Sequence, residues 1–170
     1  MGYDCAVRVL SSSDQEAALE VINTAARWYE EILPVDALHP QEMDAGQWQD
    51  AARRMVWYGS FLESQLIAVM ALQPIPPVAL VRHGYVLPPY QRQRIGTALL
   101  EHLERAAGDA QRIIIGTYAA NYKARAVLEK RGYRLSADSA AILARYFDVA
   151  ADRAAQSVTY EKVLRQSPRN

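Results

Sequence analysis

The sequence predicts one α/β domain, of the α+β kind, in which helices flank a mixed and mostly antiparallel central sheet. Its length of 170 residues is close to the ~150 residues of a typical domain. Hydrophobic residues make up 51% of the chain and charged residues 22%, which is typical of a folded protein with a core. Segments of alternating apolar residues, typical of strands, are interspersed with segments in which apolar residues recur every three or four positions, as in helices. These three observations favour a sandwich of helices around a sheet.

The N-terminal half is expected to contain a strand, two helices and then three strands. Alternation over 5–10 predicts the first strand, and the Ser and Asp side chains of 11–14 can cap the helix that follows. Turn-prone residues separate the last three strands, which predicts an antiparallel meander. The expected elements are a strand over 5–10, a helix that ends near 31, a helix over 43–55, and strands over 56–62, 66–73 and 78–87.

The C-terminal half alternates helices with short strands. A helix is predicted from Ile95 to a glycine cap at Gly108, and another from Asn121 to Gly132. The apolar positions expected to face the core are Ile95, Ala98, Leu99, Leu103 and Ala106 in the first helix, and Ala124, Val127 and Leu128 in the second. The remaining elements are strands over 113–115, 133–135 and 157–164 and a helix over 140–146. We expect a single domain over 1–166 and a frayed tail over 167–170.

Charge and cysteine content exclude several classes of protein. Lys plus Arg and Asp plus Glu number 19 each, so the chain has no overall positive charge with which to bind nucleic acid. The single cysteine, Cys5, cannot form an internal disulfide or a cysteine metal site. The longest apolar run, Leu66–Leu72, is far shorter than the ~20 residues that cross a bilayer, and the N-terminus lacks the basic start of a signal peptide. We therefore expect a cytoplasmic protein with neither nucleic-acid nor membrane partners and with no metal.

The segment 86–100 has the local pattern of an anion-binding site. A strand is followed by a basic loop and then by a helix that begins near Gly96, which directs backbone N–H groups and a helix dipole to one place. An ordinary strand-to-helix turn is the alternative, because a lone glycine is a weak signal. Charge is also unevenly distributed, with nine basic and four acidic residues in 91–134, and six acidic but no basic residues in 28–52. Such a distribution suits an anionic cofactor at one end and a cationic substrate at the other, although charge runs are usually solvated faces.

Two motifs in this half resemble those of the GNAT superfamily of N-acetyltransferases. The first has Val86, Pro88, Gln91 and Gly96, with Arg94 where the family usually has a glycine. The second follows at the usual distance and comprises Asn121, Ala124, Glu129-Lys130 and Gly132-Tyr133. The resemblance implies a GNAT-like sheet with a splay between the fourth and fifth strands. It also implies an acetyl-CoA-dependent enzyme that acetylates a primary amine by direct attack in a ternary complex, and it allows a homodimer.

By this resemblance, the loop into the helix at Gly96 would bind the diphosphate of acetyl-CoA, and the strand ending at Val86 would pair with its pantetheine arm. A nest of backbone N–H groups can bind such a diphosphate without a metal ion. Arg94 at a glycine position would add a cation, although a side chain at positive φ is costly. The residues expected to bind the cofactor are Tyr85, Val86, Leu87, Gln91, Arg92, Gln93, Arg94, Ile95, Gly96, Thr97, Ala98 and Asn121.

Catalysis requires a proton acceptor, because an alkylamine has a pKa of about 10.4. His83, just before the expected cofactor strand, is the first candidate for the general base, and a histidine hydrogen-bonded within the sheet is the alternative. Many relatives place an acidic tyrosine where this chain has Leu128, so Tyr118 and Tyr122 are candidates for the general acid, with packing as the alternative.

The resemblance further implies that the first two helices shape the acceptor pocket, and aromatic and acidic residues there would favour a small cationic amine. The candidates are Trp28, Tyr29 and Glu30. At least one of Trp28, Tyr29 and Trp48 is expected to pack in the core. Leu128 makes a non-catalytic acyl-CoA-binding or regulatory module the competing hypothesis, whereas a dinucleotide-binding oxidoreductase is disfavoured because no G-x-G-x-x-G is present.

Overall fold

The computed structural model describes residues 3–164, whose strands form one seven-stranded sheet in the order β1-β2-β3-β4-β5-β7-β6. Neighbouring strands are antiparallel except for the parallel pair β4 and β5, which confirms the mixed, mostly antiparallel sheet. The predicted domain end at 166 and the tail over 167–170 lie outside the described residues. The strands are β1 (Ala6–Val9), β2 (Val56–Leu62), β3 (Gln65–Ile75), β4 (Val78–Val86), β5 (Arg112–Tyr118), β6 (Arg134–Leu135) and β7 (Ser157–Val163).

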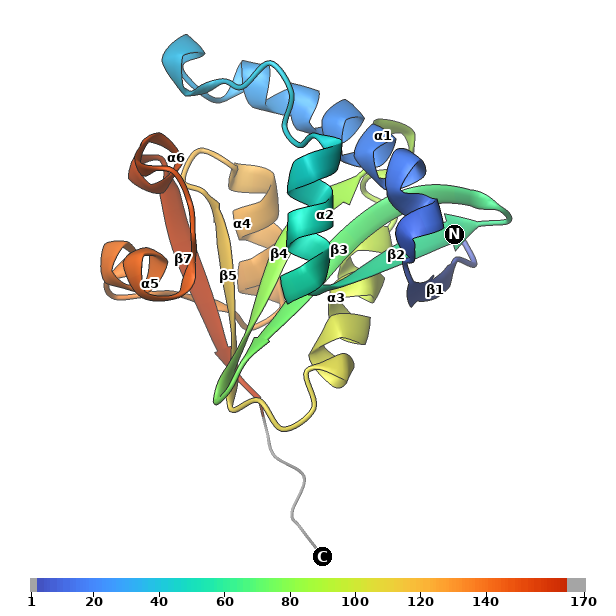
Figure 1. The fold of residues 1–170 in the computed structure, drawn as a ribbon. Helices are drawn as coiled ribbons and strands as arrows, with labels where there is room; N and C mark the ends of the chain where they lie inside the picture. The colour runs from blue at the N-terminus through green and yellow to red at the C-terminus, as the bar shows by residue number, and fades with distance from the viewer. Residues whose placement is uncertain (1–2, 165–170) are drawn as a thin grey trace, which may run out of the picture.

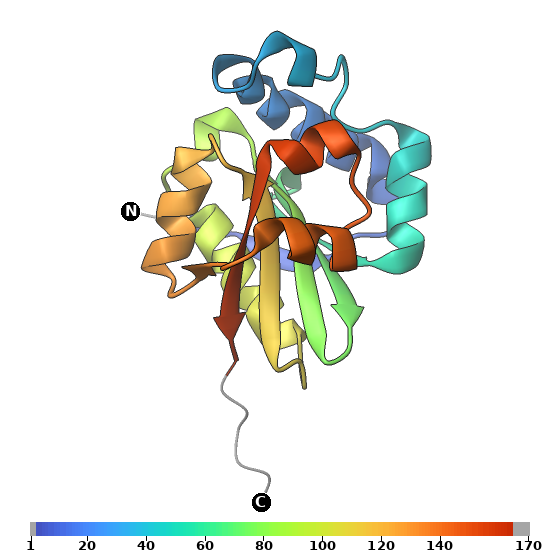
Figure 2. The same cartoon turned by 90° about the vertical axis from the view of Figure 1, so that its left-hand side faces the viewer.

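Helices cover both faces of the sheet (Figures 1 and 2). On one face, α1 and α2 pack over β2, β3 and β4, and α5 packs over β4, β5 and β7, while α3 and α4 cover the opposite face. The helices are α1 (Gln15–Ala26), α2 (Ala45–Arg54), α3 (Ile95–Ala106), α4 (Tyr122–Lys130), α5 (Ser139–Tyr146) and α6 (Ala151–Ala155). The first helix, expected to run to 31, ends at 26 and continues as a 3₁₀ turn over 27–31, and α6 is an element that the sequence pattern did not predict.

Three of the predicted core positions are wrong. Ala98 and Ala106 of α3 are exposed, and Leu100 is buried beside Ile95, Leu99 and Leu103 instead. The reason is that Leu100 and Ala98 lie on opposite flanks of the same apolar stripe, and packing against β2, β3 and β4 selects one flank. In α4, Val127 is exposed and Leu128 is the buried residue.

A β-bulge in β4 changes which side chains face each layer. Val69 pairs with Tyr85 and Ala71 with Arg82, so His83 and Gly84 together lie opposite the one residue between Val69 and Ala71. His83 adopts a φ of 55°, in the left-handed region. Because successive strand side chains alternate between faces, the extra residue reverses the alternation beyond it. Tyr85 consequently belongs to the α1 side of the sheet, and Val86 packs on the α3 side.

The sheet opens between β4 and β5 at their carboxyl ends. The two strands pair over Val78–Val81 and Arg112–Ile115, and they diverge beyond these residues (Figure 1). On its other edge β5 pairs with β7 along its whole length, including Gly116–Tyr118 beyond the opening. This arrangement confirms the splay expected between the fourth and fifth strands. Backbone groups that a neighbouring strand would satisfy are therefore available along the inner edge of the opening.

Candidate functional site

The loop between β4 and α3 has an unusual backbone for the residues that it contains. Arg92 and Arg94 have φ angles of 61° and 62°, so two arginines occupy the left-handed region that favours glycine. Arg94 is the N-cap of α3, and the helix ladder begins with the Ala98 N–H donating to the Arg94 carbonyl at 2.9 Å. The N–H groups of residues 95–97 precede that bond and point out of the helix start. Together with the positive end of the α3 dipole, they form a site suited to an anion.

Side chains hold this loop against the end of β4. Gln91 Nε2 donates to the Val86 carbonyl at 2.9 Å, and Gln93 Nε2 donates to the Pro89 carbonyl at 3.2 Å. A Cβ on Gly96 would lie 3.4 Å from Val86 Cγ2, so the first turn of α3 lies beside the open edge of the sheet. The Arg92 and Arg94 side chains are exposed and form no ion pair with the described residues.

The structure brings most of the predicted cofactor residues together, with three qualifications. Ile95 is buried in the core, so its backbone alone is available to a ligand. Tyr85 is buried and turned towards the α1 side, away from α3. Asn121 is the N-cap of α4, where its Oδ1 accepts from the Ala124 N–H at 3.1 Å. Val86, Leu87, Gln91–Arg94, Gly96 and Thr97 lie at the end of β4, in the loop or in the first turn of α3, whereas exposed Ala98 follows that turn.

A pocket of about 180 Å³ lies on the opposite face of the sheet, between the end of α1, the loop over residues 32–44 and the end of β5. Tyr29 and Tyr118 line it with ring centroids 4.8 Å apart, and Glu30 and Glu42 supply carboxylates to its wall. Two of the three predicted acceptor residues, Tyr29 and Glu30, thus line one pocket with one predicted catalytic residue, Tyr118.

The other predicted acceptor residue, Trp28, does not line this pocket. Its ring lies 5.8 Å from that of Tyr122, and Lys123 Nζ lies 4.1 Å from the centre of the Trp28 ring. Trp28 and Tyr122 therefore join the end of α1 to the start of α4 as a separate aromatic contact. Tyr122 is 64% exposed.

The tyrosine hydroxyls of the pocket keep their protons to high pH. Burial, followed by the Glu42 charge, raises the pKa of Tyr29, and burial raises the pKa of Tyr118. Burial is also the main cause of the raised pKa of Tyr85. Each hydroxyl can therefore donate a hydrogen bond at neutral pH.

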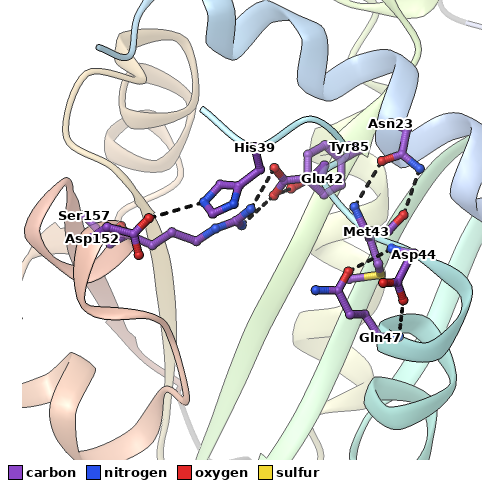
Figure 3. A network of polar contacts seen from close by, with 10 residues as sticks. Asn23, His39, Glu42, Met43, Asp44, Gln47, Tyr85, Asp152 and Ser157 are labelled. Atoms are coloured by element: carbon purple, nitrogen blue, oxygen red, sulfur yellow. Dashed lines mark hydrogen bonds and ion pairs between the residues drawn. The ribbon is translucent and has the colours of Figure 1, made fainter. Parts of the chain in front are cut away.

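Glu42 is the centre of a polar network at the edge of the pocket (Figure 3). Its Oε1 accepts from the Tyr85 hydroxyl at 2.8 Å, and its two oxygens accept from Arg153 Nη1 and Nη2 at 2.8 and 3.2 Å. Sequence reasoning counted Glu42 in an acidic segment but gave it no role, and it missed Arg153 altogether. Arg153 follows Glu42 by 111 residues, and no local pattern relates positions so far apart.

His83 lies in a stack of aromatic rings. Its ring is 5.3 Å from that of Trp57 at an interplanar angle of 23°, and Trp57 stacks in turn on Trp48 at 5.9 Å. Burial, reinforced by the cationic side chains of Arg82, Arg153 and Arg54, lowers the pKa of His83 to about 3. His83 does not line the pocket, so the structure gives its predicted role as general base no geometric support. Trp48, 3% exposed, is in the core, as expected for at least one of the three aromatic residues.

Leu128 occupies the position at which the family motif usually has a tyrosine. Its side chain is 6% exposed and packs in the core beneath α3. A leucine has no proton to donate, so an acid would have to come from another residue.

Residues 3–164 contain neither a membrane-spanning helix nor a cluster of metal-ligating side chains. None of the helices in this range is long and apolar enough to cross a membrane. Within the same range, no three His, Cys, Asp or Glu side chains are grouped so that they could hold a metal ion.

Comparisons with known proteins agree with this geometry. The family model for the Acetyltransferase (GNAT) family matches residues 20–133. The chain is similar to the PaiA N-acetyltransferase from Thermoplasma acidophilum in complex with coenzyme A, with 18% identity, a TM-score of 0.76 and coverage of 95% of this chain and 99% of that one. It is also similar to the ribosomal-protein-S18-alanine N-acetyltransferase from Escherichia coli, with 18% identity, a TM-score of 0.70 and coverage of 98% and 97%. The comparison with curated protein sequences gave no match.

The left-handed conformation of Arg94 predicts a difference between two substitutions. Both Arg94→Gly and Arg94→Ala remove the guanidinium, but only glycine avoids the steric cost of a Cβ at this φ. We expect the Arg94→Gly variant to have a free energy of unfolding about 0.5–1 kcal/mol higher than that of Arg94→Ala, measured by urea denaturation.

The matched control for that pair is Arg105, an exposed residue of α3 with ordinary helical geometry. There the order should reverse, with alanine more stable than glycine by about 1 kcal/mol. Equal stabilities of the Arg94→Gly and Arg94→Ala variants would contradict backbone strain at position 94.

The low pKa of His83 predicts that stability depends on pH through this residue. The unfolded chain binds the proton more readily than the folded protein, so the free energy of unfolding falls as the pH falls from about 6.5 towards 3. A His83→Phe variant keeps a ring to stack on Trp57 but cannot take up the proton. Between about pH 7.5 and 4.5 it should lose about 2–3 kcal/mol less stability than the wild type.

The pH series is measured by urea denaturation, with His102→Phe on the opposite face of the sheet as the control. Parallel curves for the wild type and His83→Phe would show that His83 titrates normally.

Proposed function

The chain belongs to the GNAT family of acetyltransferases, and on that premise we propose that it is an N-acetyltransferase that transfers the acetyl group of acetyl-CoA to a primary amine of a small cationic acceptor. One observation carries the proposal: the left-handed loop and the first turn of α3 present backbone donors beside the open edge of β4. A cytoplasmic location, a homodimer and the lack of nucleic-acid and membrane partners stay predictions.

The residues around the loop between β4 and α3 are suited to bind acetyl-CoA, the acetyl carrier. The N–H groups of residues 95–97 would bind the diphosphate, and Arg92 and Arg94 are free of described ion pairs and can add positive charge. The open edge of β4 near Val86 offers backbone groups to the amides of the pantetheine arm. The Asn121 Nδ2 donates to no other described residue, which leaves it available to the same arm.

The acceptor is proposed to approach from the other face of the sheet. The pocket opens on the α1 side, whereas the loop and α3 lie on the opposite side of the splay. Both substrates can therefore meet at the opening without exchanging places, which favours direct attack in a ternary complex. Glu30 is exposed at the pocket and forms no ion pair with another described residue, so its carboxylate is available to a cationic amine.

Acetyl-CoA supplies the activated thioester, and the protein has to manage two protons. The ammonium of the acceptor must lose one before attack. The sequence predicts His83 as the base, but its ring is buried against Trp57 outside the pocket, so we propose that water takes up this proton. A backbone N–H near Val86 would donate to the carbonyl oxygen as negative charge develops, a contribution worth about 2.7–4 kcal/mol for one donor. The departing thiolate, whose conjugate acid has a pKa of about 8.5, can receive a proton from Tyr118 or leave without one. Tyr118 is favoured over Tyr122 because it lines the pocket.

A non-catalytic acyl-CoA-binding or regulatory module is the second candidate. The observation that favours it is the buried Leu128 at the position of the usual tyrosine. It predicts binding of the carrier without turnover.

Calorimetry and an activity assay together test the proposed function. We expect saturable binding of coenzyme A, and about fivefold weaker binding to Arg94→Ala because one cation beside the diphosphate is lost. Arg134→Ala, at the far edge of the sheet, should bind like the wild type. Thiol release from acetyl-CoA is then measured with a panel of polyamines, amino acids, aminoglycosides and peptides.

Acetylation of cationic amines in that panel supports the enzyme. Binding without turnover across the panel favours the regulatory module, and turnover of neutral or anionic amines alone rules out the cationic acceptor. Absence of coenzyme A binding overturns both candidates.

His83→Phe tests the general base. Because the ring stacks on Trp57 outside the pocket and has a pKa of about 3, we expect kcat/KM for the acceptor to stay within about threefold of the wild type between pH 6 and 9. A loss of about 100-fold or more, with normal coenzyme A binding, would instead support the role predicted from the sequence.

A further inference from the structure

Glu42 connects the wall of the acceptor pocket to both halves of the opened sheet. It lies in the loop over 32–44, which separates α1 from α2 and lines the pocket. One partner, Tyr85, is on β4, directly after the bulge. The other, Arg153, is on α6, immediately before β7. Figure 3 shows the side chains of Glu42 and Tyr85 converging from their separate elements.

The contact with Arg153 has the geometry of a strong ion pair. The two terminal nitrogens of the guanidinium each donate to one carboxylate oxygen, and the side chains of Glu42 and Arg153 are 10% and 24% exposed. A sheltered bidentate pair restricts orientation far more than an exposed pair does. The helix-surface pair of Arg54 and Asp50, with side chains 41% and 57% exposed, illustrates the exposed kind.

Arg153 belongs to the β5–β7 half of the sheet. The Ser157 hydroxyl donates to the Arg153 carbonyl at 2.7 Å, which fastens α6 to the first residue of β7. That part of β7 pairs with Gly116–Tyr118 of β5. Glu42 therefore joins β4 to the β5–β7 half at the level where β4 and β5 no longer pair with each other.

Further contacts hold the same loop on either side of Glu42. His39 Nε2 lies 3.4 Å from Asp152 Oδ2, next to Arg153 on α6. Asn23 of α1 donates to the Met43 carbonyl at 2.9 Å and accepts from the Met43 N–H at 3.0 Å. The loop is thus fixed to α1, β4 and α6 within five residues.

We propose that Glu42 is a positioning residue for the acceptor, which acts by holding the pocket wall at a set distance from the opening between β4 and β5. The inference rests on the proposed function and deepens it. The proposal predicts different effects on the two substrates. Loss of the Glu42–Arg153 ion pair disturbs the α1 side of the sheet, where the acceptor is proposed to enter, and leaves the loop into α3 on the other side in place. Because Arg153 neutralises Glu42, attraction of the cationic acceptor is left to Glu30.

The first test measures how firmly the Glu42–Arg153 ion pair holds the loop over 32–44, and it needs no activity assay. The Met43 and Asp44 amides donate to the side chains of Asn23 and Gln47, so their hydrogen exchange reports on the loop. In Glu42→Gln and in Arg153→Met, we expect these amides to exchange at least about tenfold faster, while amides of α3 are unchanged. Glu31→Gln and Arg145→Met, at exposed positions outside the network, are the matched controls.

The second test is steady-state kinetics with spermidine, a polyamine of the panel, as the probe acceptor. Each single variant should raise the KM for spermidine at least about tenfold and change the KM for acetyl-CoA less than about twofold. The double variant should be no worse than either single variant, since both remove one interaction. Arg153→Lys and Tyr85→Phe, which keep part of the network, should give intermediate values and serve if a stronger variant does not fold.

Unchanged exchange at Met43 and Asp44 overturns the inference, as does an equal rise in both KM values or an additive double variant. The outcome is separable from that of the proposed function. If the wild type binds no coenzyme A, the proposed function is wrong whatever the exchange result. If coenzyme A binds normally but exchange is unaltered in Glu42→Gln and Arg153→Met, only the positioning role of Glu42 is wrong.

Discussion

The structure depends on the point at which β4 and β5 cease to pair. Up to Val81 and Ile115 the two strands satisfy each other's backbone groups, and beyond these residues the pairing between them stops. β4 continues against β3 alone, and β5 continues against β7 alone. Backbone hydrogen bonds are obligatory for buried strands, so the opening creates an edge that is complete when another molecule supplies donors and acceptors.

The bulge in β4 gives the two faces of that opening different chemistry. One extra residue at His83–Gly84 turns Tyr85 towards α1 and leaves Val86 towards α3. A tyrosine hydroxyl and a carboxylate then meet on the pocket side, while the other side has the helix start and its arginines. The left-handed φ angles at His83, Arg92 and Arg94 accompany these features, in keeping with the concentration of backbone strain at functional sites.

The Glu42–Arg153 ion pair connects the two halves of the sheet at the end where β4 and β5 no longer pair. Hydrogen bonds hold β4 to β5 near their beginnings, and the network around Glu42 connects the same two halves near their ends. This connection consists of side chains from the loop over 32–44 and from α6, so its strength depends on charge and solvent access. On the other face, the loop into α3 depends on main-chain geometry instead.

The order of elements apart from α6, the meander and the loop into α3 could be predicted from the sequence because each depends on neighbours within a few residues. Turn-prone residues between apolar segments mark β2, β3 and β4, and the spacing from Val86 to Gly96 marks the strand-to-helix turn. Tertiary structure alone decided which flank of a helix is buried, as the exchange of Ala98 for Leu100 shows. It also decided the surroundings of His83, because a bulge that shifts strand alternation leaves no mark in a hydrophobic pattern. The ion pair of Glu42 with Arg153 joins residues 111 positions apart, and only the folded chain brings them within hydrogen-bond distance. Local periodicity thus determined the elements and the loop into α3, while contacts between distant segments determined the pocket beside Glu42.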